Sequence, residues 1–152
     1  MDRIRPGLLA GFIGVAISTL TNVFLRAVGL FPEVMDLKYM AEVFIDPARE
    51  PIPAFLLGIV IHLVLGTAIG VIYYLLIKSP SVRTGVLFMI GNWLLMMIIL
   101  FPIAHRGFFG LAQGAIMPIA TLALNLEYGV IIGVLIPRLM GQPNPARLST
   151  GR

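Results

Sequence analysis

Polar side chains inside otherwise apolar stretches are the residues of this sequence that could do chemistry. A charged or amide group surrounded by hydrocarbon is energetically costly, so such a group is a functional-site candidate by default. Counted at 1.5 Å per helical residue from the ends of each stretch, these groups fall roughly 12–15 Å below one boundary, near the midplane of a bilayer. The predicted polar layer consists of Asn22, His62, Asn92, Asn125 and Glu127.

His62 offers the widest chemistry in this layer. An imidazole can carry a proton near neutral pH, ligate a metal or haem iron, or hydrogen-bond a quinone oxygen. The alternative is structural, with His62 bonded to Asn92 or Asn125 so that it pins two helices together. We predict no metal site within the chain, because the other histidine, His105, falls at the membrane edge and there is no cysteine.

Glu127 needs either a partner or a proton if it lies in hydrocarbon. Arg26 stands one helical turn outward of Asn22. It is a candidate ion-pair partner if the first and last apolar stretches form adjacent helices. Three roles stay open for Glu127: a structural ion pair, a proton-handling group, or a contact with a second subunit.

Four long apolar stretches must position these groups. They cover residues 8–25, 55–77, 86–103 and 108–136, and Glu127 is the one charged residue that they contain. About 20 helical residues cross a hydrocarbon layer about 30 Å thick. The chain is 59% hydrophobic and 12% charged, whereas soluble domains carry about 25% charged residues. We therefore predict an all-α fold, a polytopic transmembrane four-helix bundle.

The predicted layout is one transmembrane domain, residues 1–140, followed by a disordered tail, residues 141–152. A helix over 108–136 would be roughly 43 Å long, which is more than one crossing needs. Residues 106–116 are therefore interpreted as an interfacial or re-entrant segment before the last crossing helix. The four spans are placed at about 8–30, 54–77, 84–103 and 117–139.

The loop of residues 31–53 is the longest connection between predicted spans. Its apolar residues recur at three- and four-residue spacing, which is typical of a helix with one apolar face. We expect a short amphipathic helix that lies on the membrane surface. The residues of this pattern are Val34, Leu37, Met40, Val43 and Phe44.

Basic residues gather at one side of the predicted bundle. They precede the first span, connect the second to the third, and follow the fourth, and the cytoplasmic side of a membrane protein is the side enriched in Lys and Arg. Both termini are therefore expected in the cytoplasm, in a prokaryotic plasma membrane. Since topology accounts for the basic residues, nucleic acid is not expected as a partner. These residues are Arg3, Arg5, Lys78, Arg83, Arg138, Arg147 and Arg152.

Small residues recur every three or four positions in three of the spans. Such stripes let helix backbones approach closely in lipid, where no hydrophobic force drives helices together. They predict tight helix packing and carry little information about activity. The stripes consist of Gly14 and Ser18 in the first span, Gly58, Gly66 and Gly70 in the second, and Gly129 and Gly133 in the fourth.

Several segments together resemble a known family. They are GLLAGFIGVAISTL near the start, HLVLGTAIGVIYYLL from His62, and GNWLLMMIILFPIAHRGFFG from Gly91. The chain resembles an uncharacterised, domain-of-unknown-function family of small four-span prokaryotic membrane proteins. The resemblance implies a polytopic membrane protein with no established activity. Members often have a histidine where this chain has Asn125, so a paired-histidine haem or metal site is disfavoured.

The first functional hypothesis is a small non-enzymatic accessory or structural subunit of a larger membrane complex, such as an energy-transducing one. Its partners would be lipid and other membrane subunits or further copies of the chain. The alternative is a small carrier or redox-linked protein that binds quinone, haem or protons at the polar layer, in which case a quinone or haem cofactor would lie at His62. An oligomeric transporter or channel is a third hypothesis. No nucleophile–base pair predicts an enzyme.

Overall fold

The computed structural model describes residues 4–31, 33–35 and 37–141, and these residues contain helices and no strand. Four helical segments are long and apolar enough to cross a membrane. The predicted all-α membrane fold is therefore confirmed. The crossing segments are α1 (Arg5–Ala27), α2 (Pro51–Leu76), the continuous run Val82–Ile103, and α5 (Ile116–Met140).

The third crossing segment changes its helical winding along its length. It begins as α3 (Val82–Leu95), continues as the π-helix η3 (Met96–Leu100), and ends as the single turn α4 (Phe101–Ile103). Pro102 has no backbone N–H to donate to the preceding turn. Short π-helical turns are rare, and many of those that are known lie at functional sites. Here the π-helix lies in the second half of the segment, near the turn that leads to α5.

Local sequence explains where the helices start. Prolines lie in the first turn of α1 and α2, where the missing N–H has no helical partner to lose. Ser81 begins α3 with a capping box: the Thr84 N–H donates to Ser81 Oγ at 3.2 Å, and the Ser81 N–H donates to Thr84 Oγ1 at 2.9 Å.

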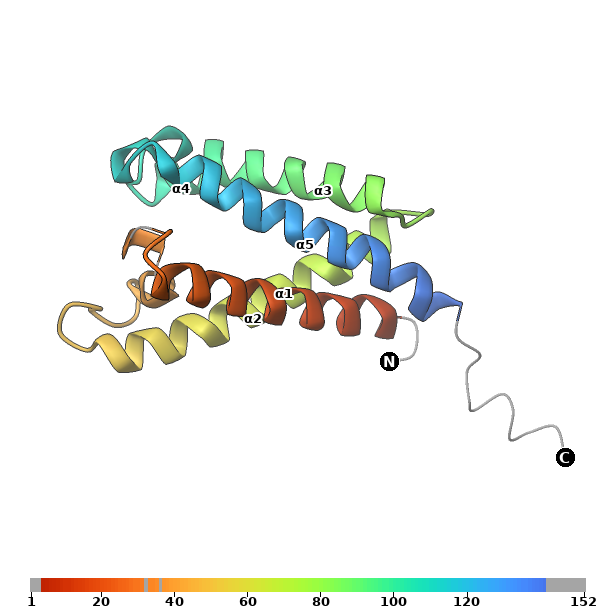
Figure 1. Cartoon of the computed structure of the whole chain (residues 1–152), viewed down its shortest axis with the longest axis horizontal. Helices are drawn as coiled ribbons and strands as arrows, with labels where there is room; N and C mark the ends of the chain where they lie inside the picture. Colours follow the sequence, from red (N-terminus) through yellow and green to blue (C-terminus); the bar gives the residue numbers. More distant parts are fainter. Residues whose placement is uncertain (1–3, 32, 36, 142–152) are drawn as a thin grey trace, which may run out of the picture.

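The crossing helices form two hairpins that meet along one seam. Helix α1 packs against α2, α3 packs against α5, and α1 joins the two hairpins by packing against α5 (Figure 1). Helices α2 and α3 make no comparable contact among the described residues. The bundle is therefore closed on the α1–α5 side and open between α2 and α3.

Glycines set the closest approaches within each hairpin. A Cβ atom at Gly70 would collide with the Gly11 backbone, and one at Gly66 would collide with Val15, so α1 and α2 touch almost backbone to backbone. In the second hairpin, a Cβ at Gly85 would collide with the carbonyl oxygen of Gly129. Close contact between backbones brings dispersion attraction that lipid cannot replace.

Three other stripe residues have different neighbours. A Cβ at Gly14 would lie 2.9 Å from the Tyr128 ring, so this glycine makes room for an aromatic side chain. A Cβ at Gly133 would strike the turn before α3, and one at Gly58 would collide with the carbonyl group of Leu37. Gly58 therefore receives the loop between α1 and α2 and not another helix. We call this loop the outer loop, after the side of the membrane on which it is expected.

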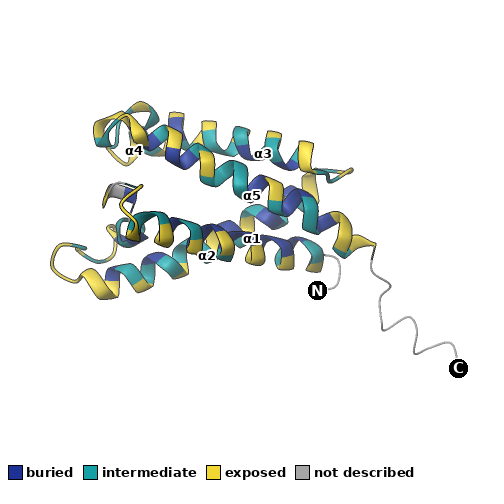
Figure 2. Cartoon of the chain, in the orientation of Figure 1, coloured by how far each residue is buried: buried dark blue, intermediate teal, exposed yellow. Residues whose placement is uncertain are grey.

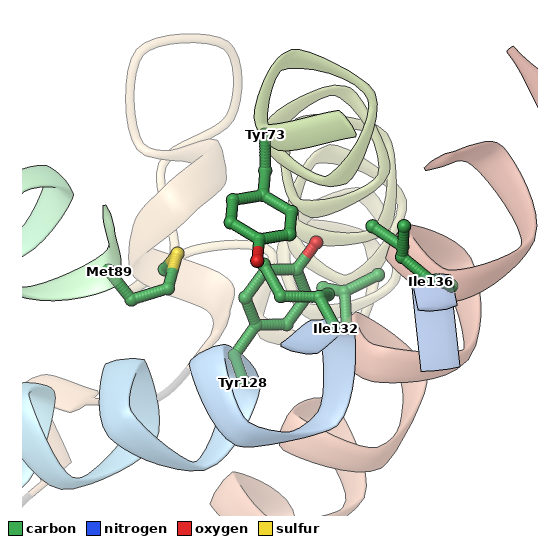
Figure 3. Close-up of a cluster of buried hydrophobic side chains, with 7 residues drawn as sticks. Tyr73, Met89, Tyr128, Ile132 and Ile136 are labelled. Carbon is green, nitrogen blue, oxygen red and sulfur yellow. The ribbon is translucent and has the colours of Figure 1, made fainter. Parts of the chain in front are cut away.

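The largest buried cluster lies where the two hairpins meet. Its labelled members, Tyr73, Met89, Tyr128, Ile132 and Ile136, come from α2, α3 and α5 (Figure 3). Most other large apolar side chains face outward, and the exposed residues line the outer faces of the helices (Figure 2). Such outward apolar faces suit hydrocarbon, which solvates Leu and Ile as readily as a protein interior does.

The outer loop differs from the expected amphipathic α-helix. It contains two 3₁₀ turns, η1 (Glu33–Met35) and η2 (Leu37–Ala41), and Leu37 and Ala41 are buried against the bundle. Val43 and Phe44 lie beyond η2 and are exposed. The tightly wound loop docks on α2 at Gly58, where the carbonyl group of Leu37 lies close to the helix backbone. Short 3₁₀ turns are common in such connections. The side chain of Val34 and the tail 142–152 lie outside the described residues.

The segment 106–116 is a compact 3₁₀ turn, η4 (Phe108–Gln113), that precedes α5. His105 and Phe109 have φ values of 57° and 56°, a left-handed conformation that is uncommon for residues other than glycine. Gly110 has φ of 69°, and a Cβ there would lie 2.8 Å from the Phe101 ring. The segment therefore folds back over η3, α4 and the start of α5.

Candidate functional site: a cavity between the two hairpins

A cavity of ≈ 660 Å³ lies between the hairpins, with walls from all four crossing segments and the outer loop. This volume falls within the range of about 300–1,000 Å³ that is typical of small-molecule sites. Leu65 and Ile72 of α2, and Leu95 and Leu100 across from them, line the cavity and are also half exposed. The cavity therefore opens sideways, between α2 and the α3–η3 segment, onto the face that meets lipid.

The predicted polar layer divides between the cavity and a separate contact. Asn22, His62, Asn92 and Asn125 all line the cavity, whereas Glu127 does not. The remaining wall is mainly apolar, with Met, Leu and Ile side chains. An apolar chamber with a few convergent polar groups is the usual form of a site for a small amphipathic molecule.

The hydrogen bonds of Thr19 favour one tautomer of His62. The Thr19 hydroxyl donates to the Val15 carbonyl oxygen at 2.7 Å, and its oxygen lies 3.0 Å from His62 Nδ1. With the single Thr19 hydroxyl hydrogen directed at Val15, this contact favours the His62 tautomer that donates Nδ1–H to Thr19. The neutral ring then carries a lone pair on Nε2. That nitrogen has no protein partner among the described residues and remains free to accept a hydrogen bond.

A second polar group connects α3 to α5. Asn92 Nδ2 donates to Asn125 Oδ1 at 3.1 Å, and Asn125 Nδ2 donates to the Thr121 carbonyl oxygen at 2.8 Å. The Trp93 indole N–H donates to Thr121 Oγ1 at 3.1 Å. This network fixes the Asn92 side chain at the cavity wall. It leaves Asn92 Oδ1 and the second Asn92 Nδ2 hydrogen available.

Helix α1 contributes polar atoms that lack protein partners. Ser18 is 4% exposed, and its Oγ makes no hydrogen bond among the described residues. Asn22, one turn further along α1, is also 4% exposed and lines the same cavity. Buried polar groups in proteins are nearly always paired, and each exception needs an explanation. A ligand or water in the cavity would supply one.

Tyr128 forms a bridge across the inner part of the site. Its hydroxyl donates to the Gly66 carbonyl oxygen at 2.6 Å, which joins α5 to α2. The ring lies against Gly14 of α1, and Tyr128 also lines the cavity. Its sequence context contained no polar signal beyond the tyrosine itself, and we did not predict this bond.

The outer end of the cavity is closed by a contact between the two hairpins. Arg106, in the turn before η4, donates to the Tyr39 carbonyl oxygen at 3.3 Å and forms an ion pair with Glu42. The guanidinium also lies 5.9 Å from the centre of the Phe101 ring. Arg106 and Tyr39 both line the cavity. The sequence did not predict this role for Arg106.

Glu127 lies at the seam between α1 and α5. Thr21 Oγ1 donates to Glu127 Oε1 at 2.7 Å, while Oε2 is buried and has no hydrogen-bond partner among the described residues. The proposed pair with Arg26 is not formed: the ion pairs recorded for the described residues do not include Glu127. The reason is vertical offset, since Arg26 lies five residues, or roughly 7.5 Å, further along α1 than Thr21.

The hydroxyls of Thr19 and Thr21 were also missed as partners. Both lie within one turn of Asn22 and thus at the depth of the polar layer, which is the signal that could have identified them. Among the described residues, no group of three or more His, Asp or Glu side chains is placed to hold a metal ion.

Comparison with known proteins identifies a family. The chain matches, over residues 1–147, a family described as "Family of unknown function (DUF6789)". The resemblance seen in the sequence is therefore confirmed. No curated protein and no solved structure matches the chain.

Proposed function

We propose that this chain, which belongs to that family of unknown function, binds a small membrane-soluble molecule of the quinone and quinol class. The proposal is based on the chemistry of the cavity. Such a ligand enters sideways from the bilayer, between α2 and the α3–η3 segment. The observation that carries the proposal is the place of His62 in the wall of an apolar chamber, with Nδ1 held by Thr19 and Nε2 without a partner among the described residues.

The chemistry of the wall suits both redox forms of this class. A quinol hydroxyl donates a hydrogen bond, and His62 Nε2 accepts one. A quinone carbonyl accepts, and the second Asn92 Nδ2 hydrogen is available to donate. The apolar wall would hold the ring substituents and the start of an isoprenoid tail. Haem would compete for the same Nε2, and its absorption bands in the purified protein would identify it.

We propose that the protein resides in a prokaryotic plasma membrane with both chain termini in the cytoplasm. What supports this orientation is the distribution of charge. Arg5, Lys78, Arg83 and Arg138 lie at the end of the bundle that holds the start of α1 and the end of α5 (Figure 1). Cytoplasmic loops carry such an excess. The ligand would then be exchanged with the lipid of that membrane.

The chain carries its own reporter of binding, because Trp93 is its single tryptophan. Trp93 is bonded to Thr121, a residue of the cavity wall. In nanodiscs, titration with decylubiquinone should quench Trp93 fluorescence in a saturable manner. The variant Ala68→Phe fills the lateral opening, since Ala68 lines the cavity and is exposed. The Ala68→Phe variant should abolish the saturable part of the Trp93 quenching.

Val64→Phe is the matched control, because Val64 lies one turn away on α2, is exposed, and does not line the cavity. It should quench like the wild type. Equal, unsaturated quenching in all three proteins would mean that quinone only dissolves in the surrounding lipid, and the proposal would be wrong.

A second candidate function uses the same opening. Helices α2 and α3 are separated on the open side of the bundle, and Gly91 of α3 is exposed with no atom near its missing Cβ. A transmembrane helix of another subunit, or of a second copy, could pack there, as an accessory subunit requires. Purification in mild detergent should then recover a stoichiometric partner or an oligomer with the wild type. The Ala68→Phe variant should be recovered without that partner, or as a monomer.

A further inference from the structure

Glu127 belongs to a site that is separate from the cavity. It faces α1 at the seam of the two hairpins, is absent from the cavity wall, and lies near the middle of α5. The proposed ligand chemistry therefore does not use it. A carboxyl group at this depth needs an explanation of its own, because charged groups in hydrocarbon are costly and are rarely placed there without a role.

The surroundings of Glu127 supply one hydrogen bond and no recorded counter-charge. Oε1 accepts from Thr21, and Oε2 is fully buried without a donor among the described residues. On α1, the nearest charged residue is Arg26, five positions beyond Thr21. On α5, Tyr128 is the titratable neighbour, and its hydroxyl is turned to Gly66. The ion pairs recorded for the described residues are all in the outer loop or join it to Arg106.

An ionised carboxylate would carry its charge on both oxygens. In this position one of those oxygens would be a desolvated charge with no donor, which is the least favourable state of a buried carboxyl group. A proton removes the net charge whichever oxygen carries it, and the bond from Thr21 can still form. From this geometry we propose that Glu127 is a proton-binding site inside the membrane and that its carboxyl group is protonated in the folded protein.

An apolar carbodiimide tests this proposal, because dicyclohexylcarbodiimide partitions into the membrane and reacts with protonated carboxyl groups. The acid gives its proton to a reagent nitrogen, and its oxygen bonds to the central carbon. Acyl migration then leaves an N-acylurea, so the peptide gains the mass of one whole reagent molecule. The reaction is run on the full-length protein in liposomes near neutral pH, and the adduct is located by peptide mass spectrometry.

The expected result is one adduct at Glu127 that is lost in Glu127→Gln. A water-soluble carbodiimide with an added amine should modify exposed acids such as Asp46 and Glu50 and leave Glu127 unmodified. Protection of Glu127 by Na⁺ or K⁺ at constant pH would overturn the proposal, since the bound species would then be a metal ion.

Infrared spectroscopy covers the case in which the reagent cannot reach a buried oxygen. A protonated Glu127 gives a carboxylic C=O stretching band that shifts on exchange into D₂O and is missing in Glu127→Gln. The glutamine variant is a neutral isostere and should remain folded. If neither the adduct nor the band is found in folded wild-type protein, Glu127 is ionised and the proposal fails.

Discussion

His62 and Thr19 form the contact on which the binding proposal rests. Thr19→Val keeps the shape of the side chain and removes the acceptor for His62 Nδ1–H, which leaves a part-buried donor unpaired. We expect thermal unfolding in detergent to show a loss of about 1–3 kcal/mol. Quinone binding should weaken as well, because the tautomer of His62 is no longer fixed. Thr19→Ser should restore both.

Thr67 provides the control for this experiment. Its hydroxyl donates to the Leu63 carbonyl oxygen within α2 at 2.7 Å and makes no recorded bond to another helix. Thr67→Val should therefore leave quinone binding unchanged. If both threonine variants reduce binding equally, the orientation of His62 is not set by Thr19.

At the scale of residues, depth could be predicted and partners could not. Counting from span ends placed Asn22, His62, Asn92 and Asn125 in one layer, and all four line the cavity. The bonds of His62 to Thr19 and of Glu127 to Thr21 depend on how each helix is rotated about its axis. Depth carries no information about rotation, so it could not decide between Arg26 and Thr21 as the partner of Glu127.

Glycine positions on α3 give a prediction at the scale of elements. Gly85 contacts the α5 backbone, whereas a Cβ atom at Gly91 would meet nothing within 4 Å. Gly85→Ala should destabilise the protein by about 1–3 kcal/mol, because a methyl group forces the hairpin apart. Gly91→Ala should be neutral or stabilise by up to about 1 kcal/mol, since alanine is the better helix former. Thermal unfolding of the two variants measures the difference.

The contact of Arg106 with Glu42 joins the outer loop to the second hairpin. Arg106→Gln removes the ion pair, and the loop should become more accessible to protease between Phe44 and Glu50. Arg49→Gln is the control, because its pair with Asp46 is local and exposed, and such pairs contribute little. Identical cleavage rates for wild type and Arg106→Gln in liposomes would show that the contact does not hold the loop.

The crossing helices could be predicted, and the irregular segments between them could not. Long apolar stretches with a proline in or near the first turn define α2 and α5 within a few residues. The outer loop has the apolar spacing of an α-helix, yet docking on Gly58 favours two 3₁₀ turns. The π-helix η3 likewise has no local signal beyond Pro102. Tertiary contact decides these segments.

At the scale of the whole molecule, orientation in the membrane can be tested directly, because the chain has no cysteine. Ser79→Cys lies in the α2–α3 connection, and Ala48→Cys lies in the outer loop. In intact cells, an impermeant maleimide should label Ala48→Cys alone. Both should react once the membrane is permeabilised. Labelling of Ser79→Cys from outside would reverse the proposed orientation.

The arrangement of two hairpins joined along one seam was beyond sequence reasoning. Small-residue stripes predicted close packing but not which helices would pair. A stripe on α2 is used by α1 and the outer loop, and this leaves α2 and α3 apart. The cavity is a consequence of that unpaired side. Its polar groups were visible in the sequence, whereas the space between them was not.

The most direct test of the account is to identify what the cavity holds. Wild-type protein, Ala68→Phe and Val64→Phe are purified from native membranes in mild detergent, and bound small molecules are analysed by native mass spectrometry. If the cavity binds quinone, the wild type and Val64→Phe should each carry one isoprenoid quinone per chain, and Ala68→Phe should carry none. The same phospholipids on all three proteins, with no quinone on any, would contradict it.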